Sequence, residues 1–280
     1  MAKERSLEKS YELREKAHTL IPAGAHTYSK GDDQFPSNAP GFIVKGKGCY
    51  VWDIDGNKYL DWGMGLRSVI LGHAYPRVVD AAKEQLKNGS NFTRPSPLEY
   101  ELAELLHKIL PSAEMVKLAK NGSDVNDAAI RLARAHTGRD KIAYCKDHPF
   151  FSVGDWFIGT TACNAGIPKS ITDLSVSFKY NDVESVKAMF EQNPNQIACV
   201  IMEAATVDQP KDDFLNKVKE IAHQHGAVFI LDEVITGFRY NLGGAQKHFN
   251  VNPDLTTFGK GIANGFSVSA LVGKKEIMER

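Results

Sequence analysis

The sequence predicts an α/β fold in which a mainly parallel sheet is flanked by helices. Two short runs, 197–203 and 227–231, are apolar up to their ends, as is typical of strands buried on both faces of a parallel sheet. Between them lies DFLNKVKEIAHQHG, which has helical apolar spacing and ends at Gly226. A strand, a helix and a strand in this order form a βαβ unit with a right-handed crossover, so we expect the two strands to be parallel neighbours.

Length and composition limit the class of protein. The chain has 280 residues, enough for one large domain or for one domain with a smaller part. It carries 34 basic and 34 acidic residues, and this zero net charge predicts no general affinity for nucleic acid or anionic lipid. No apolar run approaches the roughly 20 residues that span a bilayer, so we expect no membrane partner.

The cysteines and the N-terminal segment bear on the compartment. The cysteines are scattered and lack the close pairs of a zinc site: Cys49, Cys145, Cys163 and Cys199. Because there is no disulfide framework, a reducing cytoplasm is the expected location. The N-terminal segment, MAKERSLEKSYELREKAH, is charged throughout, which predicts that it is not a targeting segment.

The first third of the chain predicts helices separated by a loop and a hairpin. Residues 3–20 have an apolar side and predict an amphipathic helix, whereas residues 21–40 are rich in Gly, Pro, Ser and Asp and predict an extended loop. Alternating residues on both sides of a turn at Gly56 predict a β-hairpin. Two further helices are expected to begin at about Pro76 and Pro97.

A strand, a turn and a helix are expected next. The strand 115–119 leads through NGSD into a helix that stops at Gly138. Gly122 and Ser123 at such an N-terminus favour phosphate binding, because free backbone N–H groups, a hydroxyl and the positive end of the helix dipole meet there. Ser and Asp are also ordinary N-caps, so the local pattern leaves both interpretations open. Residues 141–145 predict another buried strand.

Acidic residues come at the ends of the two predicted parallel strands. Glu203 ends the first strand, and Asp232 and Glu233 end the second. Because side chains alternate along a strand, Asp232 and Val234 point to one face and Glu233 to the other. Open α/β sheets bind ligands at the carboxyl ends of their strands, which makes Asp232 and Glu203 candidates for binding a positively charged group. Each acid can also simply cap a loop.

Lys260 lies in TTFGKGIANG, a segment of small residues that lets the backbone come close to a ligand. A lysine can form a Schiff base with a carbonyl, and pyridoxal 5'-phosphate (PLP) requires such a lysine together with an acid on its pyridinium nitrogen. Lys260 and Asp232 would supply that pair. The alternative is a solvated lysine and a loop-capping acid, since both residue types are mostly exposed.

The order of these motifs resembles a known family. LDEVITGFR, then NPDL, then FGKGIANG is similar to the signature of class III (fold-type I) PLP-dependent aminotransferases, in particular their glutamate-1-semialdehyde aminomutase-like branch. The resemblance implies the PLP-dependent transferase fold type I. It also implies that Lys260 holds PLP as a Schiff base, that Asp232 pairs with the pyridine nitrogen and that Val234 packs against one ring face. The reaction would transfer an amino group between a small-molecule amino donor and a carbonyl acceptor, or shift it within one molecule.

The same resemblance implies further cofactor contacts. Gly122 and Ser123 stand where family members bind the PLP phosphate. Relatives place an aromatic residue, commonly in a Tyr-His-Gly motif, on the outer face of the ring. Anchoring on DWFIGTT puts Phe150 at the Tyr position and Phe151 at the His position. A phenylalanine can stack but has no hydroxyl, so no proton relay is expected there. Both phenylalanines can equally be plain core residues.

The resemblance also implies a division into domains. Residues 1–70 would form an N-terminal arm and a segment of the small α+β domain, and residues 71–280 the large PLP-binding domain. Family members continue beyond Arg280, so we expect a C-terminally truncated member. A homodimer is implied, because the active sites of the family lie at a subunit interface. After IPAG the chain lacks the Pro-Val-Arg segment of the glutamate-semialdehyde enzymes, which predicts a different substrate specificity.

The sequence bears on two rival classes of function. A non-catalytic or inactive PLP-fold protein that serves as a binding or assembly partner would agree with the missing C-terminal part, whereas intact Lys260 and Asp232 argue against it. A nucleotide-binding oxidoreductase requires Gly-x-Gly-x-x-Gly directly after a strand. The glycines of GKGIANG lack that context, so this class is not expected.

Overall fold

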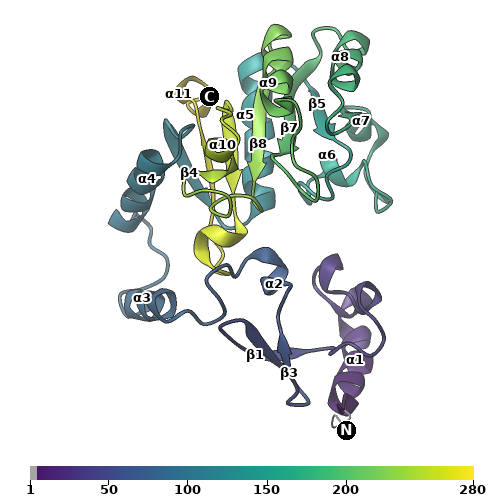
Figure 1. Ribbon diagram of the computed structural model, residues 1–280, viewed down its shortest axis with the longest axis vertical. Coiled ribbons are helices and arrows are strands. Elements are labelled where there is room, and N and C mark those ends of the chain that lie inside the picture. Colours follow the sequence, from purple (N-terminus) through teal and green to yellow (C-terminus); the bar gives the residue numbers. More distant parts are fainter. Residues whose placement is uncertain (1–4) are drawn as a thin grey trace. The chain divides into compact units, whose positions relative to one another are not determined.

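The computed structural model describes residues 5–280 and divides into two compact units (Figure 1). The first unit ends at Asn91, and the second spans Phe92–Arg280. The division into domains at residue 70 stays a prediction. All the candidate site residues belong to the second unit and therefore to one compact body.

The first unit holds a three-stranded antiparallel sheet in the order β1-β2-β3. Its elements are α1 (Glu8–Leu20), β1 (Ile43–Lys47), β2 (Tyr50–Asp53), β3 (Lys58–Leu60), α2 (Met64–Arg67) and α3 (Pro76–Leu86). The expected hairpin is confirmed as β2–β3, and Gly56 has the left-handed backbone, φ 87°, that glycine adopts readily. A further strand, β1, pairs with β2 and extends the hairpin to a sheet. The expected loop over residues 21–40 contains three single 3₁₀ turns.

The first helix differs from the expected range 3–20, of which residues 3 and 4 lie outside the described part of the chain. α1 begins only at Glu8, and no side chain at its N-cap position supports the start. The cap comes from a distant residue instead. The Asp55 carboxylate accepts the backbone N–H of Lys9 at 2.8 Å and that of Ser10 at 3.0 Å. A helix start that depends on such a long-range bond has no local signal in the sequence.

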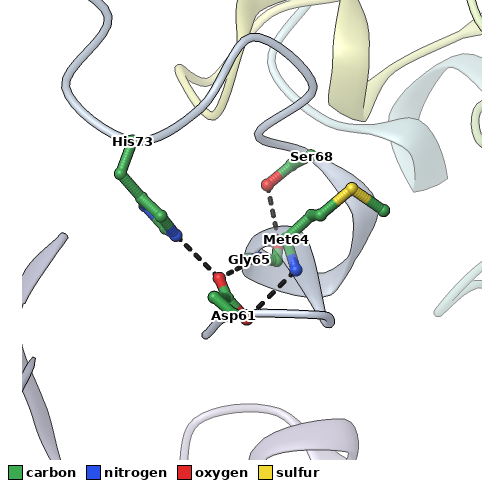
Figure 2. Close-up of polar contacts among 5 residues, drawn as sticks. All are labelled: Asp61, Met64, Gly65, Ser68 and His73. Carbon is green, nitrogen blue, oxygen red and sulfur yellow. Dashed lines mark hydrogen bonds and ion pairs between the residues drawn. The ribbon is translucent and has the colours of Figure 1, made fainter. Parts of the chain in front are cut away.

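The turn after β3 has a left-handed backbone. Residues 64–67 all have φ between 48° and 67°, a conformation that costs a non-glycine residue roughly 1–2 kcal/mol. Figure 2 shows that Asp61 holds this turn: its carboxylate accepts the N–H of Met64 and of Gly65, each at 3.1 Å, and lies 2.7 Å from the ring of His73. These bonds offset part of the backbone strain.

The second unit is built on a seven-stranded sheet in the order β4-β10-β9-β8-β7-β5-β6. Its strands are β4 (Met115–Ala119), β5 (Lys141–Cys145), β6 (Ser175–Phe178), β7 (Ile197–Glu203), β8 (Val228–Glu233), β9 (Leu255–Phe258) and β10 (Ser269–Gly273). Only β10 runs antiparallel to its neighbours, and the other pairs are parallel. The expected mainly parallel sheet and its βαβ unit are confirmed.

Helices cover both faces of this sheet. They are α4 (Pro97–Ile109), α5 (Gly122–Thr137), α6 (Asp155–Ile158), α7 (Lys169–Thr172), α8 (Val183–Gln192), α9 (Phe214–Gln224), α10 (Gly244–His248), the 3₁₀ helix η4 (Lys260–Ala263) and α11 (Lys275–Met278). α5 ends at Gly138, whose φ of 67° closes the helix as expected. No helix among residues 5–280 is long and apolar enough to cross a membrane.

Alternation along β8 decides which residues reach the site. Phe229 and Leu231 pack in the core formed with α8 and α9, whereas Val228 and Ile230 pack in the core formed with α5. Figure 1 shows α9 and α5 on opposite sides of the sheet. The side chain of Asp232 continues the second set and faces α5.

Candidate active site

The candidate residues follow the carboxyl ends of four strands of the large sheet. Gly122 and Ser123 follow β4, Glu203 ends β7, Asp232 is near the end of β8, and Lys260 comes two residues after β9. Glu203 and Asp232 are register partners on adjacent parallel strands, as the sequence predicted. Because β4, β7, β8 and β9 run in the same direction, their carboxyl ends meet at one edge of the sheet, where open α/β folds bind ligands.

Asp232 is a buried carboxylate held by two donors. Its Oδ2 accepts the side-chain amide of Asn126 at 2.7 Å, and its Oδ1 accepts the backbone N–H of Val234 at 2.8 Å. Burial raises the pKa of Asp232 to about 6, while these two hydrogen bonds and the positive charge of Lys260 favour ionisation. A buried acid whose ionised form depends on hydrogen bonds and on a nearby positive charge is suited to pair with a cation.

Glu233, the next residue, serves the fold instead. It points to the opposite face of β8, where its carboxylate accepts the backbone N–H groups of Ala245 and Gln246 at the N-terminus of α10. Burial raises its pKa, and these donors act in the opposite direction. The predicted opposite orientations of Asp232 and Glu233 are therefore confirmed.

Glu203 is buried beside Asp232, next to a histidine that was not a candidate residue. The backbone N–H of Glu203 donates to Nδ1 of His148 at 3.0 Å, so the imidazole carries its proton on Nε2. Burial lowers the pKa of His148 to about 4 and keeps the ring neutral. His148 thus orients the end of β7 without adding charge to the site.

Two glycines and a valine form a close-packed cradle between β4, β8 and β9. A Cβ atom at Gly122 would lie 2.9 Å from Cγ1 of Val234, and one at Gly259 would lie 3.1 Å from the same methyl. The Cβ position at Gly259 is also 3.7 Å from Cα of Gly122. A side chain at either position would require Val234 to move, so glycine lets the backbone before α5 and before η4 approach Val234 closely.

Gly122→Ala is expected to displace Val234 and to weaken binding of the PLP cofactor that the sequence predicts roughly tenfold, because overpacking of this kind typically costs 1–3 kcal/mol. The free energy of unfolding in urea should fall for the same reason. A double-mutant cycle with Val234→Ala, which removes the clashing methyl groups, is the control. Additive effects of the two substitutions would contradict the close contact.

The N-terminus of α5 offers donors for an anion. Asn121 is the N-cap: its Oδ1 accepts the N–H of Asp124 at 3.0 Å, so the alternative that Ser123 or Asp124 caps the helix is wrong. The exposed Asp124 carboxylate is held by the Asn121 amide at 2.8 Å. The Ser123 hydroxyl accepts the N–H of Val153 at 3.1 Å, and its own proton can be donated to another acceptor.

The two phenylalanines have different environments. Phe151 is buried and packs between His148, Trp156 and Phe157, so it is a core residue. Phe150 is 47% exposed, and its ring lies edge-on to Phe157 with centroids 5.6 Å apart. Of the two phenylalanines, Phe151 alone is the plain core residue that the sequence allowed for both. Phe150 keeps part of its ring exposed.

Lys260 begins η4 with a left-handed backbone, φ 44°, directly after the cradle glycine Gly259. The residue is partly exposed, and its positive charge acts on Asp232. On β9, Thr257 is the register partner of Asp232, and its buried hydroxyl has no hydrogen-bond partner among residues 5–280. The site thus combines a buried acid and an unsatisfied hydroxyl on the adjacent strands β8 and β9 with a lysine just after β9.

Sequence reasoning missed Asn126, which contacts Asp232 directly. A signal was present: Asn126 is a polar residue on the apolar face of α5, four residues before Ile130 and seven before Ala133. A buried amide on such a face requires partners. Which partners it has depends on the packing of α5 against the sheet.

Comparison with known proteins agrees with this geometry. Residues 33–280 match the family model of class-III aminotransferases. A glutamate-1-semialdehyde 2,1-aminomutase from Chlorobium phaeobacteroides is 42% identical over 97% of this chain. A crystal structure of an omega-transaminase from Sphaerobacter thermophilus superposes with a TM-score of 0.88 at 30% identity over 96% of the chain. The PLP-containing FumI protein of Sphingopyxis sp. MTA144 superposes with a TM-score of 0.89 at 29% identity, also over 96%.

The chain spans only part of these proteins. It covers 66% of the aminomutase, 64% of the omega-transaminase and 66% of FumI. The match nevertheless includes nearly all of this chain, with the expected fold type I and a PLP-binding family. The chain therefore belongs to the class-III aminotransferases.

Proposed function

We propose that this chain binds PLP through Lys260 and contributes the cofactor-binding part of an enzyme that transfers amino groups. The observation that carries this proposal is the position of Lys260, which follows the carboxyl end of β9, next to the end of the adjacent strand β8 that carries the buried Asp232. A lysine and an acid in this relation are what PLP chemistry requires. Family membership supports the same function.

The residues of the edge fit PLP at both ends of the molecule. The Asp232 carboxylate suits a protonated pyridine nitrogen, because burial disfavours its ionised form and a positive charge beside it, as Lys260 already shows, favours that form. The close packing of Gly122 and Gly259 on Val234 holds that side chain between the segments that carry Ser123 and Lys260, where it would pack against one face of the ring. Ser123, at the start of α5, adds a hydroxyl and the positive end of a helix dipole for a phosphate.

Each residue then has a defined task. When bound, PLP supplies an aldehyde that condenses with the Lys260 amine and a ring that withdraws electrons from the substrate carbon. The Lys260 amine would hold the cofactor and would also move the proton as general base and acid. Asp232 keeps the ring nitrogen protonated. Phe150 offers its exposed face for stacking, and Glu203 provides a second negative charge beside Asp232 for a cationic group.

The substrates are proposed to be a small-molecule amino donor and a carbonyl acceptor. The 42%-identical relative is named as an aminomutase, and the structural relatives include transaminases, so both transfer and an internal shift are consistent with this site. We further propose a homodimer, as the family implies, and a cytoplasmic location, which the four free cysteines favour. The non-catalytic alternative is not favoured, because the chain keeps both Lys260 and Asp232 and belongs to the class-III aminotransferases.

An absorption spectrum of the 280-residue chain with added PLP tests the proposal. A visible band is expected, and borohydride should remove it and leave the cofactor fixed to the peptide that contains Lys260. Peptide mass mapping identifies the modified lysine. A folded chain without the band, or with the label on surface lysines alone, would contradict the proposed function. Loss of the band on adding candidate amino donors would then rank the substrates.

A further inference from the structure

Asn126 connects two segments that lie far apart in the sequence. It is fully buried in α5, and its Nδ2 donates to the carbonyl oxygen of Phe151 at 2.6 Å and to Oδ2 of Asp232 at 2.7 Å. Phe151 belongs to the loop after β5 that carries Phe150, and Asp232 belongs to β8. One amide group thus joins the acid of the proposed cofactor site to its aromatic loop.

We propose that Asn126 is a positioning residue, which fixes the Asp232 carboxylate toward the cofactor and ties it to the loop that carries Phe150. This inference rests on the proposed function, since it concerns the same site. Asn126 would act through Asp232 and the loop, without touching the substrate. The carboxylate keeps further lone pairs for a ligand, because each of its oxygens accepts a single hydrogen bond from Asn126 or Val234.

The orientation of the amide follows from its partners. Both neighbours of Nδ2 are acceptors, so an exchanged amide would bring its oxygen against two oxygens. In the observed orientation, Oδ1 of Asn126 is buried and has no hydrogen-bond partner among the described residues. A buried oxygen without a hydrogen-bond partner is destabilising. A leucine at position 126 would fill a similar space and would bury no such oxygen. An asparagine that lowers the stability of the fold is typical of a functional site.

The charges around Asp232 define what Asn126 contributes. On β7 and after β9, Glu203 and Lys260 approach Asp232 with opposite signs. On α5 the Asp127 carboxylate accepts hydrogen bonds from Ser152 and Trp156, and on β8 itself Glu233 faces away. The side-chain amide of Asn126 donates a hydrogen bond to this carboxylate, and that bond favours the ionised form.

Asp127 provides a matched control on the same helix. Its Oδ1 accepts the hydroxyl of Ser152 and the indole N–H of Trp156, each at 2.6 Å. It therefore anchors the aromatic loop, as Asn126 does, but its hydrogen bonds go to the loop and not to Asp232. A role of Asn126 confined to holding the loop would make substitutions at positions 126 and 127 equivalent.

The decisive measurement is the titration of Asp232 by NMR of carboxyl-labelled aspartate in the full 280-residue chain without PLP, assigned with Asp232→Asn. Asn126→Leu is expected to raise the midpoint by about one to two pH units, the shift that loss of one charge-assisted hydrogen bond gives. Asp127→Asn should leave the midpoint unchanged or slightly lower, since it removes a nearby negative charge. With PLP added, Asn126→Leu should weaken binding about 10- to 100-fold.

An unchanged midpoint in folded Asn126→Leu, or an equal rise in Asp127→Asn, would overturn the proposal. If Asn126→Leu does not fold, the isosteric Asn126→Asp keeps the shape and removes the amide donor. Its second carboxyl beside Asp232 should raise the midpoint of the pair even further. The titration requires no cofactor, so a chain that fails to bind PLP would disprove the proposed function and leave the test of Asn126 intact.

Discussion

Lys260→Ala is expected to abolish the visible PLP band and the borohydride-fixed adduct completely. The substitution removes the amine that attaches the cofactor and the group proposed to move the proton. Loss of general acid–base catalysis alone reduces rates roughly 10²- to 10⁴-fold, so amino transfer by any active assembly that contains this chain should fall at least that far. The spectrum of the variant with PLP and single-turnover assays with an amino donor measure the two effects.

Lys260→Arg separates the charge of the lysine from its chemistry. Arginine keeps a positive charge near Asp232 but remains protonated and cannot attach the cofactor. The Arg variant should therefore lack the band while retaining more non-covalent PLP affinity than Lys260→Ala. Persistence of a borohydride-fixed label in either variant would show that another lysine carries the cofactor. As a control, Lys275→Ala on the exposed surface should leave the spectrum unchanged.

Asp232→Asn is expected to weaken PLP binding roughly 10²- to 10³-fold, because removing one partner of a buried ion pair typically costs 3–5 kcal/mol. The neutral amide cannot keep the ring nitrogen protonated, so the cofactor that does bind should withdraw electrons poorly. A titration of PLP absorbance gives the affinity. Glu233→Gln, which alters the neighbouring acid that caps α10, should destabilise the chain without a comparable loss of affinity in the folded fraction.

Asp232→Asn also tests the burial of Asp232, through the pH dependence of the free energy of unfolding without PLP. The folded pKa of about 6 lies above the ordinary value of 3.8, so between these values the folded state holds the proton more tightly than the unfolded state. The contribution of Asp232 to the free energy of unfolding is therefore fully present below pH 4. As the pH rises through 6 this contribution is lost, by about 3 kcal/mol in total. Subtracting the unfolding free energy of Asp232→Asn isolates the effect. A difference that stays constant between pH 4 and 7 would contradict the burial.

Local signals in the sequence were sufficient for the elements that carry the site. The apolar run of β7 ends at Glu203, as predicted, because a strand buried on both faces tolerates no polar residue before its end. The glycine after α5 and the glycine-bounded turn of the hairpin likewise mark ends that backbone geometry imposes. The order of Asp232 and Lys260 in their motifs predicted the family, which the comparisons confirm.

Packing decided what the sequence alone left open. Whether Phe150 or Phe151 enters the core depends on the neighbours Trp156 and Phe157, and periodicity cannot distinguish adjacent residues in an irregular loop. The capping of α1 by Asp55 and the bond from Asn126 to Asp232 join residues far apart in the chain. Such contacts form only when elements dock. The sequence thus determined the strands, the helices and the chemistry-bearing residues, whereas the tertiary structure decided which polar groups hold them, since hydrogen bonds between distant segments leave no local pattern.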